Sequence, residues 1–227
     1  MVLPLLAWGG VALVAAIAGY FTYDNWDDIV TYFSGKKIVI LGQRATGKTT
    51  LMHFLMHGEM VENPSATIGV ETVSGKSLDA LKFKVKISDT QKDYPGCNGS
   101  YEIWKTAATE ADILVYLFRI DEWMLDTEKT EAAIQGHINN IMQSTMKKNV
   151  PLFLIGTHLD LLDKIEFTNS EEKNQFIAEI INEPFFKGIQ HSFINDDRVA
   201  HISLGSLKDR EGLSEMVNFI LSHAKES

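Results

Sequence analysis

An apolar strand that runs directly into a glycine-rich loop constrains this chain more than any other sequence feature. The strand covers Lys37–Leu41, and the segment Gly42–Thr49 has the spacing GxxxxGK[ST] at the start of a helical pattern. Backbone N–H groups can surround an anion only where glycines permit close approach, and the helix directs its positive dipole end at the same point. The spacing therefore predicts a phosphate-binding loop between a strand and a helix. A tight glycine turn that binds nothing is the alternative.

Two side chains in this loop have distinct predicted roles. Lys48 is expected to reach the β- and γ-phosphates of a nucleotide, where it counts as a catalytic residue, and the Thr49 hydroxyl is expected to ligate Mg²⁺. The residues expected to bind the nucleotide here are Gly42, Gln43, Arg44, Ala45, Thr46, Gly47, Lys48, Thr49 and Thr50.

The beginning of the chain is apolar. No residue from Leu3 to Tyr23 carries a charged side chain, and about 20 apolar residues are enough to cross a bilayer as a helix. We therefore expect a transmembrane signal anchor over residues 1–23 and a juxtamembrane helical linker over residues 24–35. A cleaved signal peptide and a buried core helix are the alternatives.

Charge predicts how such an anchor is oriented. The first basic residues, Lys36 and Lys37, lie on the C-terminal side of the apolar stretch, and positively charged flanks stay in the cytoplasm. We therefore expect a single-pass membrane protein with its N-terminus outside or in the lumen and its folded body in the cytoplasm. The formal net charge is −9, which argues against nucleic acid as a partner because that affinity depends on basic residues.

The rest of the chain, residues 36–227, alternates between strand-like and helical patterns and is expected to form one domain. Strands are expected at Lys37–Leu41, Val70–Val73, Leu81–Ile87, Ile113–Phe118, Pro151–Ile155 and Val199–Leu204. Helices are expected at Gly47–His57, Ser100–Thr109, Asp126–Met146, Ser170–Asn182 and Glu211–Ala224, and an irregular connection at Phe185–Asp197. This alternation predicts an α/β fold of the P-loop NTPase class, with a mostly parallel six-stranded sheet and helices on both faces.

Together with the phosphate loop, Ser65–Val73 and Asp89 resemble the Ras superfamily of small GTPases, and within it the Arf-like branch, over essentially all of residues 36–226. Ser65–Val73 resembles the family's switch I, which implies that Thr67 closes on Mg²⁺ and the γ-phosphate and acts in catalysis. Asp89 follows the third strand, which implies that it holds Mg²⁺ through water. The resemblance thus implies GTP or GDP with Mg²⁺ as cofactors, and Thr49, Thr67 and Asp89 as metal ligands.

The chain departs from the family pattern just after Asp89. The family has Asp-x-x-Gly followed by a water-orienting glutamine, whereas this chain has Lys92 where glycine belongs. Gln91 can supply the catalytic, water-orienting amide only if this loop is shortened. Arg44 stands where Ras-type loops usually have glycine, and either stabilises charge during hydrolysis or points to solvent. Slow GTP hydrolysis is therefore expected.

The segment Thr157–Asp160 resembles the family's guanine-reading loop. Asp160 would accept hydrogen bonds from the guanine N1–H and exocyclic amine, a donor pair that adenine lacks. Thr157 replaces the commoner asparagine, and His158 replaces a lysine, although an imidazole can still stack on a base. The segment Ser203–Ser206 resembles the family's last base-binding loop, with Gly205 in place of lysine, and the Leu204 N–H is expected to reach the guanine O6.

These expectations describe a membrane-anchored GTPase that hydrolyses GTP slowly and recruits a protein partner in its GTP state. One N-terminal span joined to an Arf-like domain also resembles the architecture of signal recognition particle receptor beta subunits. The alternative is a catalytically inert, GTP-bound docking or scaffold subunit, which Lys92 favours. An ATP-using P-loop enzyme is a third hypothesis, against which Asp160 counts.

Overall fold

The computed structural model describes residues 35–60, 70–74, 84–88, 98–145, 150–162, 167–194 and 198–224. The predicted anchor over residues 1–23, nearly all of the predicted linker, and Thr67, Asp89 and Gln91 lie outside these ranges. Within the ranges, no helix has both the length and the apolar character that crossing a bilayer requires. The predictions for the anchor and its orientation stay predictions.

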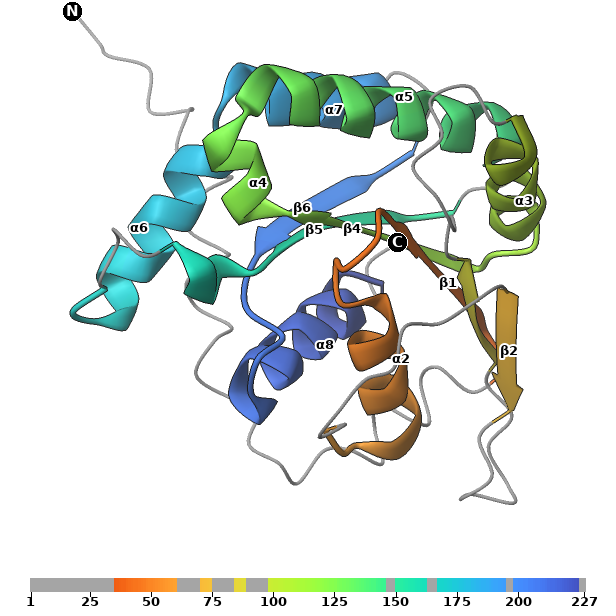
Figure 1. Ribbon diagram of the computed structural model, residues 1–227, viewed down its shortest axis with the longest axis horizontal. Coiled ribbons are helices and arrows are strands. Elements are labelled where there is room, and N and C mark those ends of the chain that lie inside the picture. The colour runs from red at the N-terminus through yellow and green to blue at the C-terminus, as the bar shows by residue number, and fades with distance from the viewer. Residues whose placement is uncertain are drawn as a thin grey trace, which may run out of the picture.

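Among the described residues, six strands form one sheet through the middle of the molecule (Figure 1). They are β1 (Lys37–Gly42), β2 (Val70–Ser74), β3 (Lys84–Ser88), β4 (Ile113–Arg119), β5 (Leu152–Thr157) and β6 (Ala200–Leu204). Their spatial order is β2-β3-β1-β4-β5-β6; β2 pairs antiparallel with β3, and every other neighbouring pair is parallel. The predicted mostly parallel six-stranded sheet is confirmed.

Helices cover both faces of this sheet (Figure 1). On one face lie α2 (Lys48–His57) and α8 (Arg210–Ala224). On the other lie α3 (Asn98–Thr109), α4 (Ile120–Leu125), α5 (Thr127–Thr145), α6 (Ser170–Ile181) and α7 (Pro184–Ile194). A short 3-10 helix, η2 (Leu159–Leu161), follows β5. The predicted helical cover on both faces is therefore confirmed as well.

Strand β1 shows why apolar runs form this sheet. Ile38 and Ile40 belong to the core cluster beneath α2 and α8, whereas Val39 and Leu41 belong to the cluster on the opposite face. Successive side chains of a strand point to opposite faces, so a strand that is covered on both needs apolar residues at every position. The continuous apolar run in the sequence is the signature of this arrangement.

The expectation of an irregular connection at Phe185–Asp197 is wrong, because most of this segment belongs to helix α7. Phe186, Ile189 and Phe193 recur at helical spacing and are buried. The proline that begins the helix resembles a loop signal, but proline is well tolerated in a first helical turn. Burial of the apolar face therefore decides the structure of the segment.

The parallel strands determine where a ligand can bind. Strands β1, β4, β5 and β6 run in the same direction, so the loops at their carboxyl ends lie along one edge of the sheet. In open α/β sheets, ligands bind outside this edge. The fold thus places the phosphate loop after β1 on the same edge as the loops after β5 and β6.

Candidate functional site

Backbone conformation shapes the loop between β1 and α2. Gly42 has a φ of 144°, Gly47 of 86° and Ala45 of 59°, all in a region that side-chain-bearing residues rarely adopt. A Cβ atom on Gly42 would lie 2.3 Å from the carbonyl oxygen of Leu117 on β4. Because that neighbour is backbone, a larger residue would force the two strands apart. Glycine here permits a loop whose amide groups can line an anion site.

Lys48, the first residue of α2, is charged and yet only 4% exposed. Its Nζ donates a hydrogen bond to the carbonyl oxygen of Gln43 and lies 3.5 Å from Thr46 Oγ1. Thr46 Oγ1 also donates to the Gln43 carbonyl oxygen, over 2.9 Å. These contacts hold the lysine across its own loop. An opposite charge stabilises a buried ammonium group, and a phosphate in this loop would supply one.

The other predicted residues of this loop differ in exposure. Thr49 and Thr50 are half-buried in the first turn of α2, whereas Arg44 and Ala45 are exposed. Of the three predicted metal ligands, Thr49 is the one within the described residues. Among these residues, no three histidine, cysteine, aspartate or glutamate side chains come together to hold a metal ion. A hydroxyl ligand that shares Mg²⁺ with phosphate oxygens is the arrangement this loop fits.

Thr157, at the end of β5, is fully buried and connects two loops. Its hydroxyl lies 3.1 Å from the carbonyl oxygen of Thr46 in the phosphate loop and 3.1 Å from that of Phe118 on β4. The same oxygen lies 2.8 Å from His158 Nδ1. Thr157 begins the predicted guanine-reading loop, Thr157–Asp160, which is called the base loop below. Its hydroxyl therefore fixes the position of the base loop relative to the phosphate loop.

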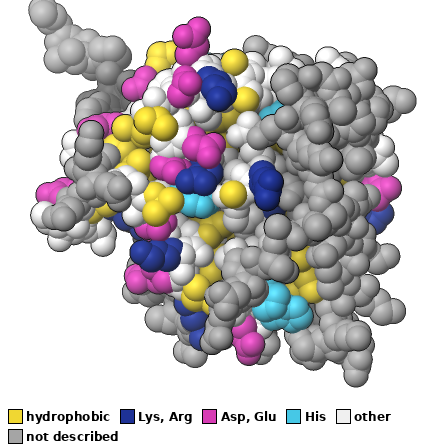
Figure 2. Space-filling model, viewed as in Figure 1, with side chains coloured by type: hydrophobic (Ala, Val, Ile, Leu, Met, Phe, Trp, Pro, Cys, Tyr) yellow, Lys and Arg dark blue, Asp and Glu magenta, His cyan; other side chains and the backbone are white. Residues whose placement is uncertain are grey.

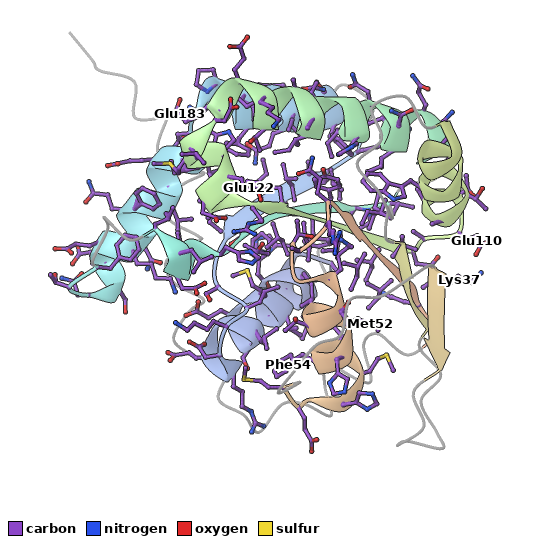
Figure 3. All side chains as sticks on the ribbon, viewed as in Figure 1. Lys37, Met52, Phe54, Glu110, Glu122 and Glu183 are labelled. Carbon is purple, nitrogen blue, oxygen red and sulfur yellow. The ribbon has the colours of Figure 1, made fainter. Side chains whose placement is uncertain are left out.

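Next to this contact, His158 and Arg119 form the side of the base loop. Arg119 pairs with Thr157 in the sheet and binds Asp121 through Nε at 3.1 Å and Nη2 at 2.5 Å. It also lies 3.3 Å from Glu122, which Figure 3 labels on α4. Burial lowers the pKa of His158, and the positive charge of Arg119 lowers it further. Both effects favour the uncharged imidazole, which is suited to packing against an uncharged ring.

Asp160, the predicted base reader, is exposed and held by a residue from the next loop. Its Oδ1 accepts a hydrogen bond of 2.6 Å from the hydroxyl of Ser206. The backbones of the two loops are also joined, because Leu159 N donates to the Gly205 carbonyl oxygen over 3.1 Å. Sequence reasoning did not single out Ser206 as a site residue. Its signal was a hydroxyl at the end of the segment Ser203–Ser206 that resembles the last base-binding loop.

The loop after β6 also contacts the phosphate loop. Ser203 and Leu204 are buried at the end of β6, and the next residue, Gly205, donates its N–H to the Gly156 carbonyl oxygen over 2.8 Å. The predicted contact of the Leu204 N–H with guanine stays a prediction. A Cβ on Gly47 would lie 2.6 Å from Leu207 Cδ1, which places Leu207 against the start of α2. Three loops that are far apart in sequence are therefore packed into one site, with phosphate-binding features at one end and an aspartate at the other.

A hollow of about 430 Å³ lies elsewhere, between α3 and α5. Lys105, Thr106, Thr109 and Gln143 line it. None of these residues belongs to the three loops, so the hollow is separate from the site described above.

Comparisons with known proteins agree with this geometry. The Ras family model matches residues 37–194, which is more than half of the 227-residue chain. The Ras-related protein Rab-19 of Xenopus laevis is 26% identical over 142 residues, which cover 56% of this chain and 56% of that protein. The match thus spans little more than half the length of this relative. The chain belongs to the Ras family, whose members are GTPases that bind GTP and GDP with Mg²⁺.

Proposed function

We propose that this chain is a GTP-binding switch that hydrolyses GTP slowly and recruits a protein partner to a membrane in its GTP state. The observation that carries the nucleotide assignment is the hydrogen bond of 3.1 Å between the Thr157 hydroxyl and the Thr46 carbonyl oxygen. This bond joins a loop suited to phosphates to a loop suited to a purine base. A ligand that fills both loops has a base and a phosphate chain at a fixed separation, as a nucleotide does.

The described residues would bind and orient GTP. The backbone amides of residues 42–47 would hold the phosphate chain, and Lys48 would place its charge beside the β- and γ-phosphates. Mg²⁺, held by Thr49 with the predicted ligands Thr67 and Asp89, would neutralise charge that develops on the phosphates. Asp160 would accept hydrogen bonds from guanine while the Ser206 hydroxyl keeps its carboxylate in place.

Slow hydrolysis is proposed from the sequence that follows Asp89. Lys92 occupies the place of the glycine whose N–H approaches the γ-phosphate in the family, and Gln91 is offset from the usual water-orienting position. Water positioning and an added positive charge account for large parts of the rate in these enzymes. Without a partner that supplies them, turnover is expected to be slow.

The membrane and partner assignments rest on the sequence. An uncharged stretch from Leu3 to Tyr23 followed by Lys36 and Lys37 supports a single-pass anchor with the domain of residues 36–227 in the cytoplasm. We further propose the Arf-like branch, and an architecture like that of signal recognition particle receptor beta subunits. The partner would then be a protein subunit that binds the GTP state at this membrane.

A second candidate is a GTP-bound docking subunit that does not turn GTP over. Lys92 favours it, because replacing the mobile glycine opposes ordinary switching. In this case the nucleotide would act as a permanent part of the fold, and GTP would remain bound after purification.

The test uses the full chain purified in detergent. Bound nucleotide is released by denaturation and identified by chromatography, and single-turnover hydrolysis of GTP is then measured with Mg²⁺ and with EDTA. The switch predicts guanine nucleotide and slow phosphate release that requires Mg²⁺. Guanine nucleotide with hydrolysis at the buffer background would support the docking subunit. Adenine nucleotide would contradict both candidates and favour the ATP-using enzyme.

A further inference from the structure

Two histidines lie side by side at the end of α2 that is farthest from the phosphate loop. His53 and His57 are four residues apart in the helix, and their ring centroids are 4.4 Å apart. Residues four apart share one face of a helix. His57 is exposed and His53 is half-buried. Figure 2 shows histidine atoms at the surface over this end of α2.

A backbone contact fixes which nitrogen of His53 is available. Its Nδ1 lies 3.2 Å from the carbonyl oxygen of Glu59. A carbonyl oxygen can only accept, so this contact places the ring hydrogen on Nδ1 and leaves a lone pair on Nε2. A histidine that binds a metal through one ring nitrogen usually donates the N–H of its other ring nitrogen to an oxygen acceptor, which holds the ring at a fixed angle. His53 is thus arranged as a metal ligand would be.

The surroundings of the pair suit a divalent cation. Glu59 is exposed, and its carboxylate is close enough to raise the pKa of His57, although burial and the neighbouring His53 lower that pKa more strongly. Two imidazole rings beside a carboxylate offer nitrogen donors in a field that attracts positive charge. Because no group of three histidine, cysteine, aspartate or glutamate side chains gathers around a common point among the described residues, water would complete the coordination.

We propose that His53 and His57 together bind one late first-row divalent ion, such as Zn²⁺ or Ni²⁺, at the surface of α2. Imidazole nitrogen suits these ions, whereas Mg²⁺ and Ca²⁺ prefer oxygen ligands. The site is separate from the predicted Mg²⁺ site at Thr49. At 1.5 Å per residue, eight residues of helix place His57 about 12 Å from Thr49 along the axis.

A second histidine pair in the molecule is arranged differently. His201 and His223 have ring centroids 4.7 Å apart, but His201 stacks on Phe153 with a centroid distance of 5.1 Å. His223 makes the same kind of contact as His53, with its Nδ1 2.9 Å from the carbonyl oxygen of Phe219, so the difference between the pairs lies in His201. Burial lowers the pKa of His201 to about 4, with a smaller effect from His223. These rings pack as part of the aromatic layer between β6 and α8, so proximity of two histidines alone does not define the proposed site.

The test is calorimetric titration of the full chain in detergent with Zn²⁺, and separately with Ni²⁺, in the presence of saturating Mg²⁺ and GDP. The excess Mg²⁺ keeps the nucleotide site out of the measurement. We expect one saturable event per chain. His53→Gln or His57→Gln should each lower the metal affinity by about tenfold or more. Loss of a group that only hydrogen-bonds to a metal ligand already lowers metal affinity by about 10–100-fold.

His191→Gln is the matched control, because His191 is an exposed histidine on α7. It should bind both metals as the wild type does. Equal binding by the His57→Gln chain and the wild type would overturn the proposal, and so would the absence of any saturable event in the wild type. His57 is exposed, so this variant alone decides the result if circular dichroism shows that His53→Gln is misfolded. The readout is independent of GTP hydrolysis and holds whether or not the proposed switch function is correct.

Discussion

The phosphate loop and the base loop face the same edge of the sheet but are built in different ways. The phosphate loop depends on its backbone: Gly42, Ala45 and Gly47 all have positive φ, and Lys48 is the main side chain. The base loop depends on side chains, because Thr157, His158 and the Ser206-bound Asp160 define it. A loop that binds through its backbone requires a fixed sequence pattern, whereas side-chain contacts can be replaced by others of similar geometry. This difference explains why the first loop matches its motif fully and the second carries substitutions.

Lys48→Ala removes the buried charge of the phosphate loop, and the largest effect is expected here. Hydrogen bonds to charged groups contribute about 1.5–3 kcal/mol each, so loss of contacts to two phosphates should weaken GTP binding by about 100-fold or more. Fluorescence titration with a labelled GTP analogue measures this loss of affinity. Lys208→Ala is the control, because Lys208 is exposed in the neighbouring loop. Equal affinities for Lys48→Ala and wild type would refute the role of this loop.

Asp160→Asn should change which base is bound while the phosphate loop stays intact. The amide keeps one acceptor but places donors opposite the guanine donors, so GTP binding should fall by about 10–100-fold. Xanthosine triphosphate, which has a carbonyl where guanine has its amine, should gain affinity. Competition binding with both nucleotides measures this exchange. An unchanged preference for GTP would show that Asp160 does not read the base.

Thr157→Val tests the connection between the two loops. The substitution preserves shape but leaves the buried carbonyl oxygens of Thr46 and Phe118 without this hydroxyl. An unsatisfied buried polar group costs about 1–3 kcal/mol, and we expect a destabilisation in this range, together with weaker GTP binding. Urea unfolding measures the loss of stability. Thr157→Ser should retain most of the wild-type stability, and a Val variant as stable as wild type would count against the connection.

Lowering the pH should reduce the stability of the protein through His158 in the base loop. This is the smallest of the four predicted effects. The folded-state pKa of this histidine lies below its ordinary value of 6.5, so between the two values the unfolded chain binds more protons. Its contribution to stability is therefore complete above about pH 6.5 and is lost as the pH falls through the folded-state pKa. Urea unfolding at pH 7.5 and 5.5 should show that wild type loses more stability than His158→Gln. Equal losses would mean that burial and Arg119 do not control this group.

The sequence predicts those parts of the site that are local. The phosphate loop was recognised in full because strand, glycines, lysine and hydroxyl lie within one short segment, and the six strands were recognised from continuous apolar runs. The contact between Thr46 and Thr157 spans 111 positions, and that between Asp160 and Ser206 spans 46. Neither contact has a local pattern. Arg119 was missed for the same reason, since only the register of β4 against β5 brings it to the base loop.

Helix α7 shows the opposite limitation, because its signal is local but conflicting. Its initial proline and its glycine favour a loop, while Phe186, Ile189 and Phe193 have helical spacing. A short window cannot weigh turn-forming residues against burial that depends on the rest of the fold. The predictions for Thr67, Asp89 and Gln91 lie outside the described residues and stay predictions.

The contact of Leu207 with the start of α2 has a consequence for how long the protein survives in a cell. Because residues near both ends of the domain must meet before the site exists, an incompletely folded chain cannot bind nucleotide there. Ligands that bind only the native state raise its population by mass action. A fall in the cellular supply of guanine nucleotides would therefore increase the share of chains open to proteases, and the abundance of this protein would follow the energy status of its cell.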